Sequence, residues 1–181
     1  MAIDYEKMQA LDQLLASADL SNTSEEGVKS ELPDGYFLSE VKKAELKTSK
    51  SGNAMVAIEY NTIEDGKKSV VDEQGYAQLV EAPKTADKTI YVNYVLSNEL
   101  QIEFFVADML KFQDPETNES IFTKDDFKSS EAIENVCAML EQGGIIYIAV
   151  QTVEKKNGEP GETEKKFKPI SWKRARQLEL L

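Results

Sequence analysis

The residue types in this chain that suit anion binding gather in one short polar segment, residues 47–53. The segment contains two lysines, a glycine, an asparagine and three side-chain hydroxyls. An ammonium group attracts an anion, and the N–H groups of a tight turn donate hydrogen bonds to it. The runs on either side, about residues 35–46 and 54–63, are rich in residues typical of strands. We therefore predict a β-hairpin with an anion-binding tip.

A second concentration of positive charge lies near the end of the chain. The formal net charge is −12, which argues against nucleic acid as a partner because cation–phosphate attraction drives such binding. However, residues 154–176 hold six lysines and both arginines against four glutamates, whereas residues 1–153 hold 13 lysines against 28 acidic residues. The local field matters more than net charge for a groove. The loops 47–53 and about 154–163 are therefore two candidate lips of an anion-binding groove.

Composition excludes several classes of enzyme. The chain has no histidine, which removes Ser-His-Asp and Cys-His arrangements and most zinc sites. Its one cysteine, Cys137, excludes an internal disulfide and lies in an apolar helical pattern, so we expect a buried hydrophobe and not a nucleophile. Only carboxylate chemistry with a hard cation remains open among the common catalytic options. We expect no enzymatic activity, no cofactor and no metal.

Periodicity divides the chain into an N-terminal part, residues 1–31, and a β-rich domain, residues 32–181. The first part is expected to be an amphipathic helix over residues 3–18 and a polar linker that lets this helix dock on a partner. In the domain we expect strands over about residues 35–46, 54–63, 89–96, 145–153 and 164–171, a short extension near 69–71 and a loop over 73–87. Helices are expected over 97–111 with Ser97 as N-cap, over 130–142 and over 172–181.

Three strands, a helical insertion at about residues 97–142 and two further strands follow one another. This is the order of an OB-fold, a five-stranded Greek-key barrel with helical structure between its third and fourth strands. The expected fold class is therefore mainly β with a helical insertion (α+β), preceded by the N-terminal helix. Such barrels bind oligonucleotides across strands two and three, between the loops that join strands one–two and four–five. These loops correspond to residues 47–53 and 154–163.

Four stretches carry a resemblance to a known family: Leu32-Pro33-Asp34-Gly35-Tyr36, residues 41–55, residues 90–96 ahead of a helix, and the hairpin that ends near Lys168-Pro169-Ile170. Over about residues 32–170 the chain resembles phage-encoded single-stranded-DNA-binding proteins of the OB-fold type. The resemblance implies sequence-tolerant protection of single-stranded DNA in phage replication or recombination. It also implies a partner such as a phage recombinase, an annealing protein or a helicase, and leaves homo-oligomerisation open.

The start of the chain has neither the basic nor the apolar region of a signal peptide, and no apolar stretch is long enough to span a membrane. We therefore expect the protein in the cytoplasm of the host cell, without a membrane partner.

Candidate DNA-binding residues combine charge, aromatic character and alternation. Lysines would meet phosphates, and aromatic rings would stack on bases at about 1–3 kcal/mol per base. Tyr91 alternates with Ile90 and Val92, so Tyr91 and Asn93 face the groove if those two face the core. Core packing is the alternative role of Tyr60 and Phe167, and Trp172 could instead cap an apolar end. The full set is Lys43, Lys47, Lys50, Asn53, Tyr60, Tyr91, Asn93, Lys155, Lys156, Lys165, Lys166, Phe167, Trp172, Lys173 and Arg174.

Two other functions remain open from the sequence. Pro33-Asp34 followed by Glu45-Leu46-Lys47 imitates the Pro-Asp…Glu-x-Lys signature of a large family of Mg²⁺-dependent nucleases, in which two carboxylates hold the metal. The acidic residues of the first 153 positions would also suit an adaptor or a DNA mimic that binds a basic protein. A mimic binds no oligonucleotide at any salt concentration, whereas a single-strand-binding protein loses affinity steeply as salt rises.

Overall fold

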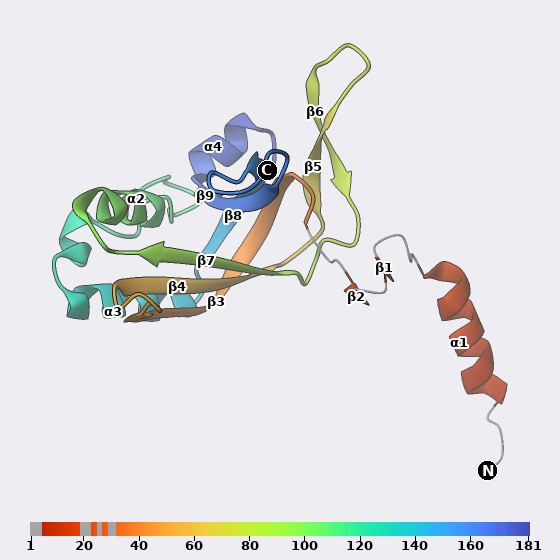
Figure 1. Ribbon diagram of the computed structural model, residues 1–181, viewed down its shortest axis with the longest axis horizontal. Coiled ribbons are helices and arrows are strands. Elements are labelled where there is room, and N and C mark those ends of the chain that lie inside the picture. The colour runs from red at the N-terminus through yellow and green to blue at the C-terminus, as the bar shows by residue number, and fades with distance from the viewer. Residues whose placement is uncertain (1–4, 19–22, 25–26, 29–31) are drawn as a thin grey trace. The chain divides into compact units, whose positions relative to one another are not determined.

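The structure is a computed structural model that describes residues 5–18, 23–24, 27–28 and 32–181 (Figure 1). Its contacts divide the chain into two compact units, residues 1–31 and 32–181. Within the described residues, no helix combines the length and the apolar character that crossing a lipid bilayer requires.

The N-terminal unit contains the expected helix, α1 (Tyr5–Ser17); residues 3 and 4 of the prediction lie outside the described residues. Its exposed apolar side chains recur at helical spacing: Met8, Leu11, Leu14 and Leu15. Two very short strands, β1 (Thr23–Ser24) and β2 (Gly27–Val28), pair antiparallel inside the predicted linker. The rest of that linker lies outside the described residues.

The second unit is built on one antiparallel sheet of seven strands. The five strands that the sequence predicts are all present, at bounds within a few residues of those expected. The strands are β3 (Gly35–Thr48), β4 (Ala54–Thr62), β5 (Gly66–Val71), β6 (Ala77–Ala82), β7 (Thr89–Val95), β8 (Ile145–Glu154) and β9 (Thr163–Ile170). The helices are α2 (Glu99–Met109), η1 (Lys124–Phe127), α3 (Ser130–Glu141) and α4 (Trp172–Gln177).

Strand β3 organises the sheet because each of its halves has a different main partner. Its first residues, 35–40, pair with β8, and residues 39–48 pair with β4. Strand β7 continues the sheet beyond β4, and β9 continues it beyond β8. In the part of the chain that the structure describes, β7 and β9 are not paired, so the sheet is open. The α+β class is confirmed, whereas the expected closed five-stranded barrel is not formed.

The core lies under one face of this sheet. Buried and less buried positions alternate along β3 and β4, as the two-residue period of a strand requires. Phe37, Val56 and Ile58 face inward and pack with Phe105 of α2 and Leu140 of α3. Cys137 of α3 is also buried in this cluster, where burial raises the pKa of its thiol to about 11. The prediction that Cys137 is a buried hydrophobe is confirmed.

The ends of the inserted helices depend on local hydrogen bonds. Helix α2 begins one residue later than expected: Asn98, not Ser97, is the N-cap, and its side chain accepts from Gln101 N at 3.0 Å. Ser129 caps α3 by accepting from Ala132 N at 3.1 Å. Gly143 follows α3 with a φ of 131°, a conformation that favours glycine. The last helix, α4, ends at Gln177 and is therefore shorter than the predicted helix over residues 172–181.

The sequence-based prediction of a loop over residues 73–87 is wrong, because β6 lies within that range and forms a hairpin with β5.

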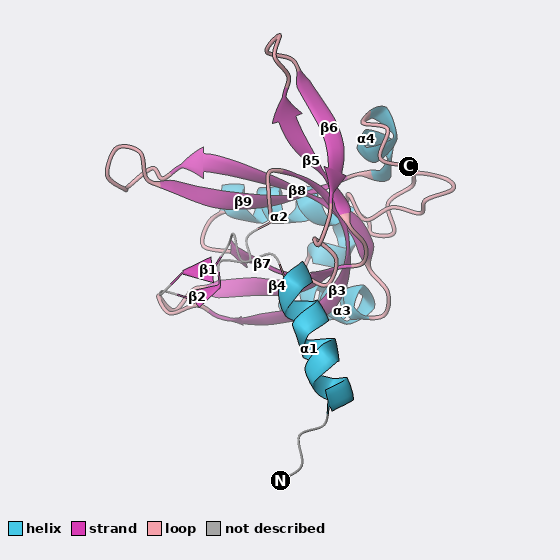
Figure 2. Ribbon diagram, turned by 90° about the vertical axis from the view of Figure 1, so that its right-hand side faces the viewer, coloured by secondary structure: helices cyan, strands magenta, loops and turns pink. Residues whose placement is uncertain are grey.

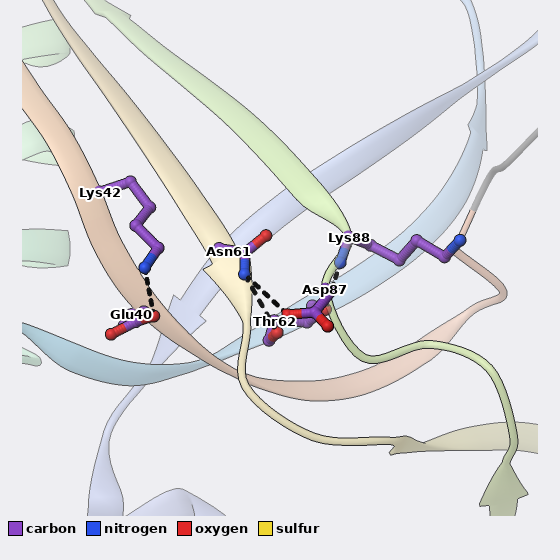
Figure 3. A network of polar contacts seen from close by, with 6 residues as sticks. All are labelled: Glu40, Lys42, Asn61, Thr62, Asp87 and Lys88. Atoms are coloured by element: carbon purple, nitrogen blue, oxygen red, sulfur yellow. Dashed lines mark hydrogen bonds and ion pairs between the residues drawn. The ribbon is translucent and has the colours of Figure 1, made fainter.

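Buried hydroxyl groups fix the base of the β5–β6 hairpin. The hydroxyl of Thr62 donates to Thr85 O at 2.6 Å and accepts from Lys88 N at 2.8 Å. Asp87 N donates to Thr62 O at 2.9 Å, and Asn61 Nδ2 donates to Asp87 Oδ1 at 3.4 Å (Figure 3). Nearby, Lys42 forms an ion pair with Glu40 at 2.6 Å (Figure 3).

Candidate nucleic-acid interface

The outward face of β3, β4 and β7 carries three rows of side chains. Strand pairing aligns Lys43 with Glu59 and Glu59 with Tyr91 in the first row. In the second row Glu45 lies opposite Ala57, and Ala57 lies opposite Asn93. The third row aligns residues 47, 55 and 95. Because side chains alternate between the two faces of a strand, all these positions share the face that points away from the core.

We call this face of β3, β4 and β7 the three-strand face. A cleft of about 260 Å³ lies on it. Tyr91 is 65% exposed, while its neighbours Ile90 and Val92 pack into the core. The expected outward orientation of Tyr91 and Asn93 is thus confirmed. The cleft therefore brings together four of the residues predicted from the sequence. Its lining is Lys43, Glu45, Lys47, Ala57, Ile58, Glu59, Tyr91 and Asn93.

Both lysines of the cleft are paired with the same carboxylate. Glu45 Oε2 lies 3.2 Å from Lys43 Nζ, and Glu45 Oε1 lies 3.4 Å from Lys47 Nζ. The hydrogen bond from Lys43, followed by that from Lys47, lowers the pKa of Glu45. Because these side chains are about half exposed, each pair contributes little to stability. Glu45 thus occupies the position between two cations where an external anion would also bind.

The tip of the β3–β4 hairpin is held by its own hydrogen bonds. Ser49 N donates to Asn53 O at 2.7 Å, and Gly52 N donates to Ser49 O at 2.9 Å. Asn53 Nδ2 donates to Ser51 Oγ at 3.2 Å, so its amide is used within the turn. Lys50 is exposed at this tip. The predicted hairpin is confirmed, with Lys50 exposed in its turn and Asn53 as a residue that shapes the turn.

The second predicted lip, the β8–β9 hairpin, extends to the left of Figure 2. Lys155 and Lys156 line a separate cleft there, with Asn157, Gly158, Glu162 and Glu164. The cleft on the three-strand face contains no residue of this hairpin. The two predicted lips thus line two different clefts, whereas the sequence led us to expect one shared groove. Lys155 Nζ lies 3.8 Å from Glu162 Oε2 in this cleft, and Lys166 is exposed further along the hairpin, on β9.

Lys165 has a structural role that the sequence did not reveal. Its Nζ lies 2.8 Å from Asp34 Oδ1, and the same oxygen accepts from the N–H of Thr152 at 2.9 Å and from its hydroxyl at 2.6 Å. Burial by itself raises the pKa of Asp34, but these hydrogen bonds from Lys165 and Thr152 outweigh it and lower the pKa. The contact ties the start of β3 to β8 and β9. Lys165 is therefore a bracing residue in this structure.

Two predicted stacking residues pack with the core. Tyr60 shares the inward face of β4 with Ile58 and is completely buried, so its predicted stacking role is wrong. Burial, with a smaller contribution from Asp108, raises the pKa of its phenol. Phe167 is half-buried and packs against the core cluster. Both rings therefore take part in core packing, which was the alternative role considered for them.

Trp172 lies at a different site from Tyr91. Its ring packs edge-on against Tyr147, with centroids 5.9 Å apart, and its Nε1 is buried without a hydrogen-bond partner among the described residues. It lines an apolar cleft of about 600 Å³ together with residues such as Ile63 and Ile145. Lys173 and Arg174 follow it as exposed residues of α4. These three predicted residues do not contribute to the cleft on the three-strand face.

The two carboxylates of the nuclease-like signature are not brought together. Asp34 precedes β3 and Glu45 lies eleven residues further along the same extended strand, on the order of 30 Å away at the rise of a β-strand. One metal ion cannot contact both. The described residues also contain no group of three or more side chains arranged to hold a metal ion.

Sequence reasoning missed the two acidic residues of the cleft, Glu45 and Glu59. The signal was present in the alternation: residues 43, 45 and 47 must share one face of a strand. Pairing of β3 with β4 then places Glu59 opposite Lys43. What the sequence alone lacked was the register of this pairing.

No protein-family model matches the chain, and no curated protein sequence matches it.

Proposed function

We propose that the protein binds and protects single-stranded DNA without strong sequence preference, in phage DNA replication or recombination, and that the three-strand face is its binding surface. One observation carries this proposal. A largely exposed aromatic ring, Tyr91, lies in one cleft with two lysines and an amide side chain. Proteins that bind single strands combine such aromatic platforms with cationic side chains along the backbone path.

The arrangement of strands supports an OB-type interpretation of the fold. Strand β3 pairs with both β4 and β8, the inserted helices separate β7 from β8, and β9 follows β8 as a hairpin. We take β3, β4, β7, β8 and β9 as the five strands of an open OB-type barrel, with the β5–β6 hairpin inserted between the second and third. In this interpretation β4 and β7 form the surface on which OB-folds bind oligonucleotides.

The chemistry of the face fits a sequence-tolerant ligand. A base can stack on the exposed ring of Tyr91, and every base has such a stacking face. Asn93 lies one row away and offers both a donor and an acceptor to a base edge. The backbones of Lys43 and Lys47 are about 13 Å apart along β3, although both ammonium groups contact Glu45 in this structure. Once a phosphate displaces Glu45, the two lysines can meet different phosphates of one strand. The exposed lysines of the β8–β9 hairpin offer a second basic surface for a longer strand.

The proposal is tested by fluorescence anisotropy with a labelled thymidine oligomer, a duplex of equal length and an RNA oligomer. We expect measurable affinity for the thymidine oligomer that falls as salt rises, with a slope of about −0.7 per phosphate contact. The duplex should bind more weakly because its bases are stacked inside. An acidic adaptor or a DNA mimic would give no binding at any salt concentration, and that result would overturn the proposal.

The position of Glu45 leads to an unusual expectation, a gain of affinity on mutation. A phosphate that enters the cleft must displace the carboxylate that holds both lysines. Glu45→Gln removes this competition. Because exposed pairs are worth about 0–1 kcal/mol each, the variant should bind the thymidine oligomer roughly 3- to 10-fold more tightly at low salt. The same anisotropy titration measures this.

The matched control is Glu59→Gln. Glu59 lines the same cleft and the substitution changes the net charge equally, but Glu59 forms no ion pair within the described residues. It should give a smaller gain. If both variants gain equally, general repulsion and not the Glu45 contact limits affinity.

A further inference from the structure

The β5–β6 hairpin projects from the rest of the second unit in both views (Figures 1 and 2). Only two residue pairs, Gly35 with Lys68 and Tyr36 with Lys67, join it to β3. Beyond them the hairpin stands clear of the sheet, and β6 pairs only with β5 among the described residues. Its apolar side chains are unusually open: Val71 is 71%, Tyr76 69% and Val80 36% exposed.

This hairpin is held firmly although it buries little. At the turn, Asp72 Oδ1 accepts from Gln74 N at 2.9 Å and from Tyr76 N at 2.8 Å, and Asp72 Oδ2 accepts from Gln78 Nε2 at 2.8 Å. At the base, Asp65 Oδ1 accepts from Thr85 N at 2.8 Å. An isolated two-stranded hairpin is marginally stable in water. These hydrogen bonds at both ends therefore stabilise the projecting hairpin.

The free edge of β6 lacks the features that usually prevent strands from pairing between molecules. Its sequence, Ala77-Gln78-Leu79-Val80-Glu81-Ala82, has no proline, no lysine and one charged residue. Strand β9 differs, because it carries three lysines and Pro169. An edge without such protection is a template for another strand.

We propose that β6 is a self-association edge, on which β6 of a second copy of this chain pairs antiparallel about a two-fold axis at Leu79. In this register Gln78 lies opposite the second copy's Val80, and Ala77 lies opposite its Glu81. No charge then meets a like charge, which matters for two chains of net charge −12 each. Parallel pairing in register would place Glu81 of one copy beside Glu81 of the other. The buried Ala82 stays outside the paired segment, residues 77–81.

The register also explains the exposed ring of Tyr76. Antiparallel pairing about Leu79 brings the tip of one hairpin to the base of the other, where the ring has a surface to pack on. A contact between two hairpins buries less than a standard interface of about 1,600 Å². The dimer is therefore reversible, with a dissociation constant in the micromolar range.

Sedimentation equilibrium of the full chain over about 1–300 µM tests this, since that range spans a weak interface. The average mass should rise with concentration from 20.3 kDa toward twice that value. Val80→Lys places a charge on the free edge and should raise the dissociation constant at least about tenfold. The control Val71→Lys adds the same charge to a more exposed valine of the same hairpin, on β5, and should dimerise like the natural chain.

A Leu79→Cys variant tests the register. Leu79 of each copy lies on the axis, so a short bismaleimide should join two copies through this cysteine, while the buried Cys137 stays unreactive. A Val71→Cys variant should not crosslink. The proposal is overturned if the natural chain stays monomeric throughout the range, or if Val80→Lys dimerises equally well. Loss of dimerisation in Val71→Lys as well, or crosslinking only through position 71, would overturn pairing along β6.

Discussion

Reversing the charge of Lys43 and Lys47 together is expected to weaken binding of a thymidine oligomer by roughly 100-fold at low salt. Both lysines line the cleft beside Tyr91, and in the variant two glutamates would join Glu45 and Glu59 there. The salt slope should also become shallower by about 1.4, because each phosphate contact on a single strand contributes about 0.7. Fluorescence anisotropy at several salt concentrations gives both quantities.

The chain offers a closely matched control for this variant. Lys124 and Lys128 are exposed, have the same spacing of four residues and lie at the helical insertion. Their reversal to glutamate changes the net charge equally, so it should lower affinity only slightly and leave the salt slope unchanged. If the two double variants weaken binding to the same extent, net charge governs the interaction and the three-strand face is not the binding surface.

Local patterns were sufficient for much of the fold. The five expected strands and the two inserted helices are present because alternation and helical spacing, together with capping residues such as Ser129, are properties of short segments. The same alternation predicted that Tyr91 and Asn93 face outward. It also implied that Tyr60 faces inward, because Tyr60 and Ile58 are two residues apart on one strand.

The missed features depend on contacts between distant segments. Strand β6 consists largely of alanine, glutamine and glutamate, which have low strand propensity, so nothing local distinguishes it from a loop. The link between Lys165 and Asp34 spans 131 positions and follows from the pairing of β3 with β8 and of β8 with β9. Whether β7 meets β9 depends on sheet curvature, which no short segment encodes. That Trp172 and Tyr91 line two different clefts also depends on how distant segments pack, so the sequence did not reveal it.

Replacing Tyr91 with alanine is expected to cost about 1–3 kcal/mol of binding free energy, or roughly 5- to 150-fold in affinity for a thymidine oligomer. The loss should be the same for oligomers of different sequence, because stacking does not depend on a particular base edge. Tyr91→Phe keeps the ring and should bind nearly like the natural chain. Because the ring is 65% exposed, the alanine variant should unfold at nearly the natural temperature.

Tyr76→Ala is the matched control for Tyr91→Ala. Tyr76 is 69% exposed, so the two substitutions remove the same ring from similarly open surfaces. However, Tyr76 lies at the tip of the β5–β6 hairpin and not among the residues of the cleft. In anisotropy titrations at a protein concentration below that of dimer formation, we expect Tyr76→Ala to bind the thymidine oligomer with the affinity of the natural chain.

Equal losses of affinity in both variants would mean that exposed aromatic surface in general, and not the alignment of Tyr91 with Lys43 across β4, attracts the oligomer. No loss in Tyr91→Ala would remove base stacking from the three-strand face and leave only its charges to account for binding.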